Sequence, residues 1–284
     1  MLSQILIQGF LISGLYALLA VGFTMIFSVG RVLNLAYGAN IMIGGYVYFV
    51  MVQEASLPKL PSFLCAILAG VMFATLTYLA LVKRLRDNPI AVEISTLILA
   101  VVMQFLIVLI FSPAPRSMWP LIPGVAHLYG VSISKSILLA MVVSWVVLGA
   151  LLVFVRKTHL GRAIRAVSMD AKGATISGID PQRISLVTWA LSGALAGMAG
   201  VFFGTYTQLD PGMWVFPLIL SVAVVIVGGI GSIVGSLIAA HIIGFMETIT
   251  TTLIGAELRG AFTMLLVIVV LLVAPKGLFG KKEL

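Results

Sequence analysis

Charged residues are scarce in this chain of 284 residues: Asp, Glu, Lys and Arg together make up only 9% of it. Water-soluble domains carry nearer a quarter charged residues, so the composition excludes a soluble globular enzyme. Cysteine occurs once, as Cys65. A lone cysteine excludes a disulfide framework and a thiolate cluster for metal.

Motifs that would carry bond chemistry are also missing. No grouping of His, Cys, Asp or Glu has metal-ligand spacing, and the chain contains no P-loop, zinc-protease motif or serine-hydrolase motif. We therefore predict no catalytic residue, no metal site and no cofactor bound by this chain. An integral-membrane enzyme is disfavoured, because the apolar runs hold no paired acids and no nucleophile–base grouping.

Long apolar runs are what the sequence has in abundance, since 61% of its residues are hydrophobic. A helix that crosses the hydrocarbon core of a bilayer needs roughly 20 apolar residues. The runs predict an all-α, polytopic bundle of transmembrane helices. Stretches without Asp, Glu, Lys or Arg cover 1–30, 32–53, 60–82, 94–115, 136–155, 184–209, 211–246 and 260–275.

The positions of the cations predict the orientation of the chain. Thirteen of the 17 Lys and Arg residues lie in the segments 83–86, 156–183 and 276–282 or at Arg31. The third segment holds Lys276, Lys281 and Lys282, and Arg259 is among the remaining cations. Loops rich in Lys and Arg face the cytoplasm. This rule explains the net charge of +8 without nucleic acid, and it predicts an outside N-terminus and a cytoplasmic C-terminus.

The run 211–246 is too long for one crossing, because 36 residues of helix extend about 54 Å against a core of roughly 30 Å. Gly228, Gly229 and Gly231 divide it into pieces of about 214–227 and 232–248. The charge-free stretch 117–134 contains two prolines and is predicted to be a loop. We expect about eight or nine crossings, with nine preferred and seven plus re-entrant segments as the alternative.

Polar residues and glycines interrupt the apolar runs at two places, which predicts a substrate pathway. Interrupted hydrophobic segments in both halves of a chain are typical of a transporter's central site. Unwound backbone there must be covered by protein or line a water-filled cavity. Ordinary helix–turn–helix connections at the interface are the alternative. The residues concerned are Asn34, Tyr37, Gly38 and Asn40 in the first segment and Gly228, Gly229, Gly231 and Ser232 in the second.

Three ionisable residues and one glycine stripe are interpreted as structural features rather than functional sites. Glu93, Glu247 and His241 are predicted to lie at the membrane interface, the acids in ion pairs, since a proton relay would need them deep in a span. Small residues spaced four apart allow helix backbones to approach closely. Such a stripe predicts helix packing at Gly193, Gly197, Gly200 and Gly204.

The longest polar stretch, 156–183, carries six cations and only two acids. Part of it is predicted to be a short helix that stops at Gly178 and Pro181. A helix along the cytoplasmic face suits docking into a groove on a soluble partner. Binding of lipid headgroups is the alternative.

Four ordered blocks of the sequence resemble the permease subunits of branched-chain amino acid ABC transporters, the LivH type, over essentially the full length. The chain departs from that pattern at Tyr37 and Ala39, where the family often has His and Glu. The matching residues are Gly14, Tyr16, Gly22, Asn34, Gly38, Met42, Gly44 and Tyr46; Thr158, Gly161, Arg162, Arg165, Asp170, Ala174 and Gly178; Gly228 to Ser232; and Pro275, Gly277, Leu278, Phe279 and Gly280.

The resemblance implies one permease domain over residues 1–284, in a bacterial or archaeal cytoplasmic membrane. It implies a heterodimer with a second related permease, two cytoplasmic ATPases that bind ATP and Mg²⁺, and an extracytoplasmic substrate-binding protein. The 156–183 loop would then hold the coupling helix, which contacts an ATPase. The coupling residues so implied are Gly161, Arg162, Arg165, Asp170, Ala174 and Gly178.

Substrate and energy source leave alternatives open. Branched-chain or other hydrophobic amino acids are the expected cargo, and relatives are associated also with urea, short amides and aromatic acids. An autonomous carrier driven by ions or protons is the rival in another class. Such a carrier would need ionisable residues deep in its spans.

Overall fold

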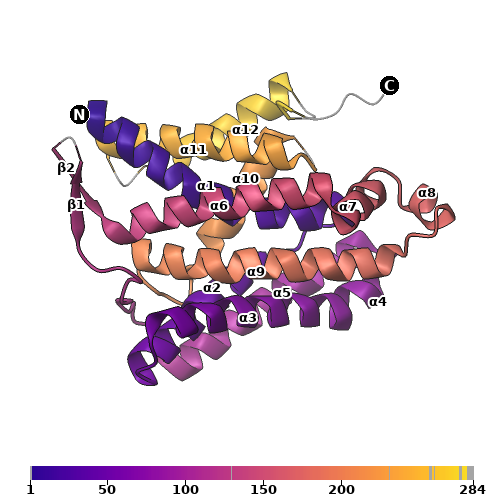
Figure 1. Ribbon diagram of the computed structural model, residues 1–284, viewed down its shortest axis with the longest axis horizontal. Helices are drawn as coiled ribbons and strands as arrows, with labels where there is room; N and C mark the ends of the chain where they lie inside the picture. The colour runs from indigo at the N-terminus through magenta and orange to yellow at the C-terminus, as the bar shows by residue number, and fades with distance from the viewer. Residues whose placement is uncertain are drawn as a thin grey trace.

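The charge-free runs of the sequence form helices that lie side by side along the longest axis of the molecule (Figure 1). The computed structural model describes residues 2–128, 130–229, 231–255, 258, 260–274 and 277–279. The helices are α1 (Leu2–Gly30), α2 (Tyr37–Phe49), α3 (Lys59–Thr77), α4 (Lys83–Leu85), α5 (Pro89–Phe111), α6 (Lys135–Lys157), α7 (His159–Met169), α8 (Ala171–Ile176), α9 (Pro181–Thr207), α10 (Val215–Gly228), α11 (Ile233–Leu253) and α12 (Ala261–Val273), with π-helical turns η1 (Val50–Glu54) and η2 (Tyr78–Val82) after α2 and α3.

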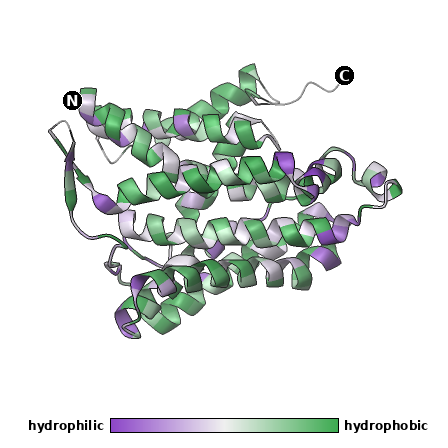
Figure 2. Cartoon of the chain, in the orientation of Figure 1, coloured by the Kyte–Doolittle hydropathy of each residue, from purple (hydrophilic) through white to green (hydrophobic). Residues whose placement is uncertain are grey.

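The predicted all-α membrane architecture is confirmed. Within the described residues, six helices are long and apolar enough to cross a bilayer, and two shorter apolar helices, α10 and α12, accompany them. The six are Leu2–Gly30, Lys59–Leu85, Pro89–Phe111, Lys135–Lys157, Pro181–Thr207 and Ile233–Leu253. Hydrophobic residues fill the middle of the bundle, and hydrophilic residues gather mostly at its two ends (Figure 2).

The stretch 117–134 is no span, as predicted, but it is more than an irregular loop. Strands β1 (Val125–Leu128) and β2 (Val131–Ser134) pair antiparallel within it. Gly130, with φ of +78°, lies between them in the left-handed region that favours glycine. The hairpin lies at the same end of the bundle as the N-terminus (Figure 1).

The predicted break in the run 211–246 is present. Helix α10 ends at Gly228 and α11 begins at Ile233. Gly229 and Gly231 have φ of +91° and +80°, a backbone conformation that side chains with a Cβ rarely adopt. The lower bound of α11 agrees with the prediction, and the helix continues five residues beyond the predicted end, to Leu253.

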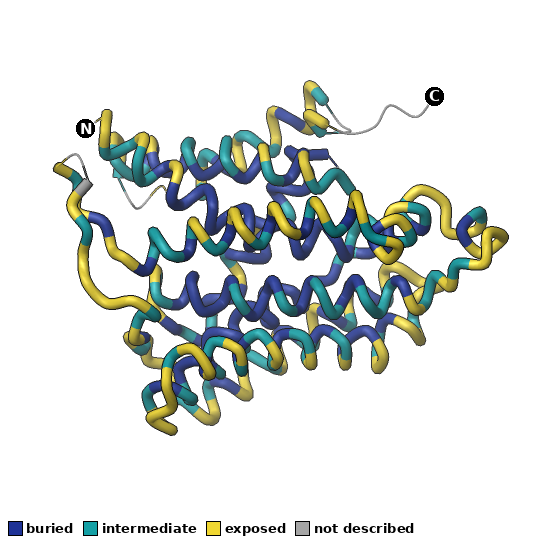
Figure 3. Tube along the Cα trace, in the orientation of Figure 1, coloured by how far each residue is buried: buried dark blue, intermediate teal, exposed yellow. Residues whose placement is uncertain are grey.

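Helix α1 occupies the centre of the bundle, where α6, α9, α10 and α11 all contact it. Over its most apolar window 83% of the residues are buried, against 17% for α5 and 22% for α6. Exposed residues recur along one face of the outer helices (Figure 3), and many of them are large and apolar. Lipid is the solvent that fits this pattern, since water would penalise such large apolar surfaces.

Side-chain hydrogen bonds link α1 to α9, α10 and α11, which follow much later in the sequence. Thr24 donates to Ser236 Oγ of α11 over 2.8 Å. Ser192 of α9 and Ser221 of α10 donate to the carbonyl oxygens of Gly22 and Leu19 over 2.8 and 3.1 Å. Each of these three hydroxyls therefore has an acceptor in the apolar interior.

Helix α9 packs closely against α2 and α3 through glycines. A Cβ on Gly44 would lie 2.6 Å from Gly197 Cα, and one on Gly200 would lie 2.9 Å from Gly45 N. A Cβ on Gly193 would lie 2.7 Å from the Cβ of Ala74. The three helices therefore approach closely because these positions carry no side chain.

The end of the bundle opposite the hairpin carries α4, α7 and α8 (Figure 1). The basic segments 83–86 and 156–183 thus lie at the same end, as the orientation argument requires. Lys276, Lys281 and Lys282, together with Arg259, lie outside the described residues.

Candidate functional sites: a buried helix junction and a basic docking segment

The chain turns back into the bundle immediately after α1. Arg31 has φ of +51°, in the left-handed region, and this reverses the chain direction. Asn34 is 3% exposed, and its Oδ1 accepts a hydrogen bond from Ala36 N over 3.1 Å. Leu35 N donates to the Thr96 hydroxyl of α5 over 3.1 Å. Side chains thus satisfy part of the unwound backbone that the apolar surroundings would otherwise penalise.

Helix α2 begins inside the bundle. Tyr37, its first residue, is fully buried, and its ring lies 5.6 Å from that of Phe23 in an edge-to-face arrangement. Its hydroxyl lies so near Gly22 that a Cβ there would clash. Since Gly22 precedes the end of α1 at Gly30 by eight residues, Tyr37 lies about 12 Å inside that end.

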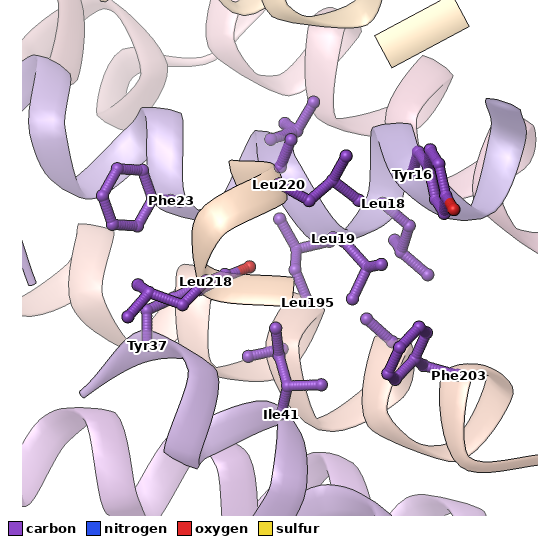
Figure 4. Close-up of a cluster of buried hydrophobic side chains, with 14 of the residues drawn as sticks. Tyr16, Leu18, Leu19, Phe23, Tyr37, Ile41, Leu195, Phe203, Leu218 and Leu220 are labelled. Carbon is purple, nitrogen blue, oxygen red and sulfur yellow. The ribbon is translucent and has the colours of Figure 1, made fainter. Parts of the chain in front are cut away.

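Helix α10 also begins inside the bundle, and it does so beside the beginning of α2. Trp214 is the N-cap residue of α10, and its indole Nε1 donates to Gln104 Oε1 of α5 over 2.7 Å. Gly38 faces the carbonyl of Trp214, and a Cβ on Gly38 would lie 3.1 Å from the Cβ of Leu218. Figure 4 shows Phe23, Tyr37 and Leu218 in the buried cluster around this contact. We call residues 34–40 with 214–218 the helix junction.

The helix junction holds buried polar groups in an apolar environment. Asn40 is 2% exposed, and no described residue donates a hydrogen bond to its Oδ1. Leaving such an atom unsatisfied costs about 1–3 kcal/mol. Neither Ala36 nor Trp214, the N-cap residues of α2 and α10, provides a side-chain cap. Both helix starts therefore present their partial positive charge with no capping side chain.

The second interrupted segment lies elsewhere. Gly228 to Ser232 is at the far end of α10, about 20 Å along that helix from Trp214. It forms a tight turn: a Cβ on Gly228 would lie 2.6 Å from the Gly235 carbonyl group, and Ser232 Oγ accepts from Gly235 N over 3.0 Å. The structure thus places Gly38, in the segment that carries Asn34, Tyr37 and Asn40, against Trp214, which in turn bonds Gln104. Sequence reasoning missed Trp214 and Gln104. Pro211 and Gly212 before α10 are the signal that could have found them.

The surroundings of the two acidic residues differ from those predicted. Glu247 is 5% exposed, and its Oε1 accepts from Tyr16 of α1 over 2.5 Å, so it lies inside the bundle rather than in an exposed ion pair. Glu93 has no cation within 4 Å among the described residues, so its predicted ion pair is absent there. The Nδ1 atom of His241 lies 2.8 Å from the Leu237 carbonyl oxygen of its own helix. Burial of Glu247 depends on a partner 231 residues away, which the sequence alone does not reveal.

The basic segment 156–183 folds into two helices with side-chain caps. The hydroxyl of Thr158 accepts from Gly161 N over 3.0 Å at the start of α7. Asp170 Oδ1 accepts from Lys172 N over 2.9 Å at the start of α8. Gly178, with φ of +79°, follows α8. Caps at these positions stabilise helices too short to persist alone.

One face of this segment packs against the transmembrane helices. Ile164 and Val167 of α7 join Ala174, Val29 of α1 and Ile184 of α9 in a small buried cluster. A Cβ on Gly161 would lie 2.5 Å from Val155 Cα, so α7 packs directly on the end of α6. Gly161 and Ala174 therefore face inward, toward the bundle.

The other face of the segment is exposed. Arg162 and Arg165 lie on it, and Arg165 Nη2 donates to the Arg156 carbonyl over 3.4 Å. Ile176, at the end of α8, is 89% exposed, and Met169 is 67% exposed. Helix α8 is the part of the segment farthest from the bundle (Figure 1). Sequence reasoning missed Met169, because an apolar residue in a short amphipathic helix is expected to be buried.

Comparison with known proteins identifies the family. The family model described as branched-chain amino acid transport system / permease component matches residues 5–274. This chain belongs to that family of permease components. It is 28% identical to the high-affinity branched-chain amino acid transport system permease proteins BraD of Pseudomonas aeruginosa and LivH of Escherichia coli, over 99% of this chain and 96% of each relative.

Archaeal and sugar-transport relatives are also similar. The probable branched-chain amino acid transport permease protein LivH of Methanocaldococcus jannaschii is 30% identical over 98% of this chain and 93% of its own. The fructose import permease protein FruF of Bifidobacterium longum is 33% identical over 43% of this chain. No solved structure matches. The chain is thus a transmembrane permease subunit and a multi-pass protein of the cytoplasmic membrane, and an autonomous carrier is not favoured.

In this permease the basic segment 156–183 contacts the end of α1 and the turn that leads from α1 to the helix junction. Arg31 Nη2 donates to the Met169 carbonyl at the end of α7 over 3.4 Å. Val29, two residues earlier, packs in the same cluster as Ile164 and Val167. A displacement of α7 would therefore act on the segment that leads to Asn34 and Tyr37.

Proposed function

We propose that this chain is one permease domain, over residues 1–284, of an ATP-driven importer for branched-chain or other small hydrophobic amino acids. The names of its relatives, which it matches over nearly their whole length, support this cargo. Urea, short amides and aromatic acids are the alternative cargoes, because Tyr37 and Ala39 stand where relatives often have His and Glu. The chain itself performs no bond chemistry.

The assembly we propose is a heterodimer with a second related permease, two cytoplasmic ATPases and an extracytoplasmic substrate-binding protein. The ATPases would bind ATP and Mg²⁺. In this arrangement the chain crosses the bilayer nine times, with its N-terminus outside and its C-terminus in the cytoplasm. Support comes from the alternating direction of the helices and from the basic segments 83–86 and 156–183 at one end.

The exposed face of the 156–183 segment is proposed to dock on an ATPase. Ile176 and Met169 are the observation that carries this assignment. Ile176 ends α8, the helix farthest from the bundle, Met169 ends α7, and both side chains are largely exposed. Arg162 and Arg165 supply charge around them, while Gly161, Asp170, Ala174 and Gly178 give the segment its shape. Apolar anchors within a polar rim are typical of protein interfaces.

The helix junction is proposed as the element that opens and closes the substrate pathway. Asn34, Tyr37, Gly38 and Asn40 lie where two helices start inside the bundle, and the start of a broken helix suits an anionic group such as a substrate carboxylate. In this proposal Gly228, Gly229, Gly231 and Ser232 form the hinge at the other end of α10. Closure of the ATPases would displace α7, and the segment after α1 would carry that displacement to α2.

Replacing Ile176 with Glu tests the docking assignment. A carboxylate cannot occupy an apolar pocket without a large desolvation cost, so substrate-stimulated ATP hydrolysis should fall at least tenfold in the reconstituted complex. Ile176→Leu keeps an apolar side chain of equal size and should retain activity. Because Ile176 is exposed, the thermal midpoint of the permease should not change. Normal co-purification of ATPase subunits with Ile176→Glu would contradict the assignment.

A further inference from the structure

A cavity lies at the basic end of the bundle, apart from the helix junction and from the exposed face of the 156–183 segment. It measures about 160 Å³ and is formed where the end of α1, the segment η2–α4 and the start of α9 meet. Val29, Gly30 and Val32 line one side. The cavity therefore borders the same turn that leads from α1 to the helix junction.

The lining of this cavity combines cations with hydrogen-bonding groups. Lys83 and Arg86 line one wall, and Gln182 and Ser185 of α9 line another. No Asp or Glu is among the lining residues. Within the part of the chain that the structure describes, Lys83 has no carboxylate within 4 Å. Arg86 has only the distant and exposed Asp87, at 3.8 Å, and such a pair contributes little.

Aromatic side chains close the inner side of the cavity. Tyr78 and Trp189 both line it, and their ring centroids are 5.7 Å apart. Trp189 is 1% exposed, while the Tyr78 hydroxyl donates to the Gln182 carbonyl over 3.2 Å. The inner side of the cavity is thus aromatic, formed by Tyr78 and Trp189, and cations lie at its opening. This polarity matches the junction between the acyl chains and the headgroup of a lipid.

The position along the helix agrees with a lipid ligand. In the apolar helix that begins at Lys59, the next cation is Lys83, which lines the cavity. At about 1.5 Å per residue, the 24 residues between them extend about 36 Å, which places Lys83 in the headgroup layer opposite Lys59. Basic pockets between transmembrane helices on the cytoplasmic side are suited to anionic headgroups.

We infer that this cavity binds the phosphodiester headgroup of an anionic phospholipid, with Lys83 and Arg86 as the charged contacts and Gln182 and Ser185 as hydrogen-bonding contacts. This inference is independent of the cargo and of the ATPase docking face. Because Gly30 and Val32 border the site, a bound lipid would hold the turn between α1 and α2 in place. Free phosphate shares the chemistry of the headgroup, so the experiment must separate the two.

The test uses the assembled permease complex in nanodiscs of phosphatidylcholine, with and without phosphatidylglycerol. Phosphatidylglycerol should raise the thermal midpoint of the permease by about 2–4 °C, which corresponds to about 1 kcal/mol for a chain of this size. The double variant Lys83→Gln/Arg86→Gln should lose this rise. The matched variant Arg84→Gln, which removes an exposed cation of the same short helix that does not line the cavity, should keep it. Arg86→Gln alone, at an exposed position, should lose part of the rise if the double variant folds poorly.

Three outcomes would overturn the inference. The first is an equal midpoint in both lipid mixtures. The second is an equal rise when inorganic phosphate is added to phosphatidylcholine nanodiscs, which would assign the site to a soluble phosphate. The third is loss of the ATPase subunits from Lys83→Gln/Arg86→Gln in phosphatidylcholine alone, which would assign the cations to a protein contact. Native mass spectrometry should show phosphatidylglycerol retained by the wild-type complex and by Arg84→Gln.

Discussion

The segments 31–40 and 228–235 look alike in sequence, since both interrupt apolar runs with glycine and polar residues, yet the structure gives them different surroundings. The first enters the bundle and buries Asn34 and Asn40 at the start of α2. The second is a short connection in which Ser232 caps α11. Glycine therefore marks a break in a helix, whereas buried amides with incomplete hydrogen bonding distinguish a candidate site from a turn.

The largest expected effect comes from filling the contact between the two helix starts. Gly38→Leu would place a side chain against the Trp214 carbonyl and Leu218, and the beginning of α10 would have to move. Overpacking of this kind costs about 1–3 kcal/mol. We expect substrate uptake to fall more than tenfold in proteoliposomes. Gly149→Leu is the matched control, because a Cβ on Gly149 meets no described atom within 4 Å. Equal uptake by the two variants would show that the junction does not govern transport.

Asn40→Leu separates transport from stability. Leucine branches at the same atom as asparagine but is larger, and it removes a buried oxygen that has no donor among the described residues. Removal of the oxygen stabilises the fold and the added volume opposes this, so the free energy of unfolding should change by no more than about 1 kcal/mol, while uptake falls. Asn34→Leu should also impair uptake without preventing complex assembly, but it should lower stability by about 1 kcal/mol because the bond to Ala36 N is lost. For both variants, thermal midpoints measure the stability and uptake rates measure the transport. Normal uptake with Asn40→Leu would remove this residue from the pathway.

The smallest effect is expected in the turn. Ser232→Ala removes the side-chain cap of α11 and should cost about 1 kcal/mol. The thermal midpoint should drop by about 2–4 °C, while uptake per folded complex remains near the wild-type level because the three glycines of the proposed hinge are unchanged. A large loss of uptake at an unchanged midpoint would instead place Ser232 on the substrate pathway.

Local features of the fold were predictable from the sequence, and contacts between distant segments were not. Run length and hydrophobicity predicted the long helices, and Gly229 and Gly231 predicted the break before α11, because a positive φ favours glycine. The partnership of Gln104 with Trp214, by contrast, joins residues 110 positions apart. Patterning along one chain carries no information about such a pair.

In the candidate sites too, local features were predictable and contacts between distant segments were not. Asn34 and Asn40 were recognisable as costly residues in an apolar run, and the basic segment was recognisable by its charge. The exposure of Met169 and the burial of Glu247 depended on tertiary packing. Period and composition indicated neither, because they describe a helix by itself rather than its neighbours.

The central position of α1 has a consequence for biogenesis. The ribosome makes α1 before α11, and Ser236, the acceptor of the Thr24 hydroxyl, is synthesised 212 residues after Thr24. Glu247, which accepts from Tyr16, follows later still. Until α11 has been translated, α1 stays in contact with lipid or with the insertion machinery. It becomes fully buried only when α11 packs against it.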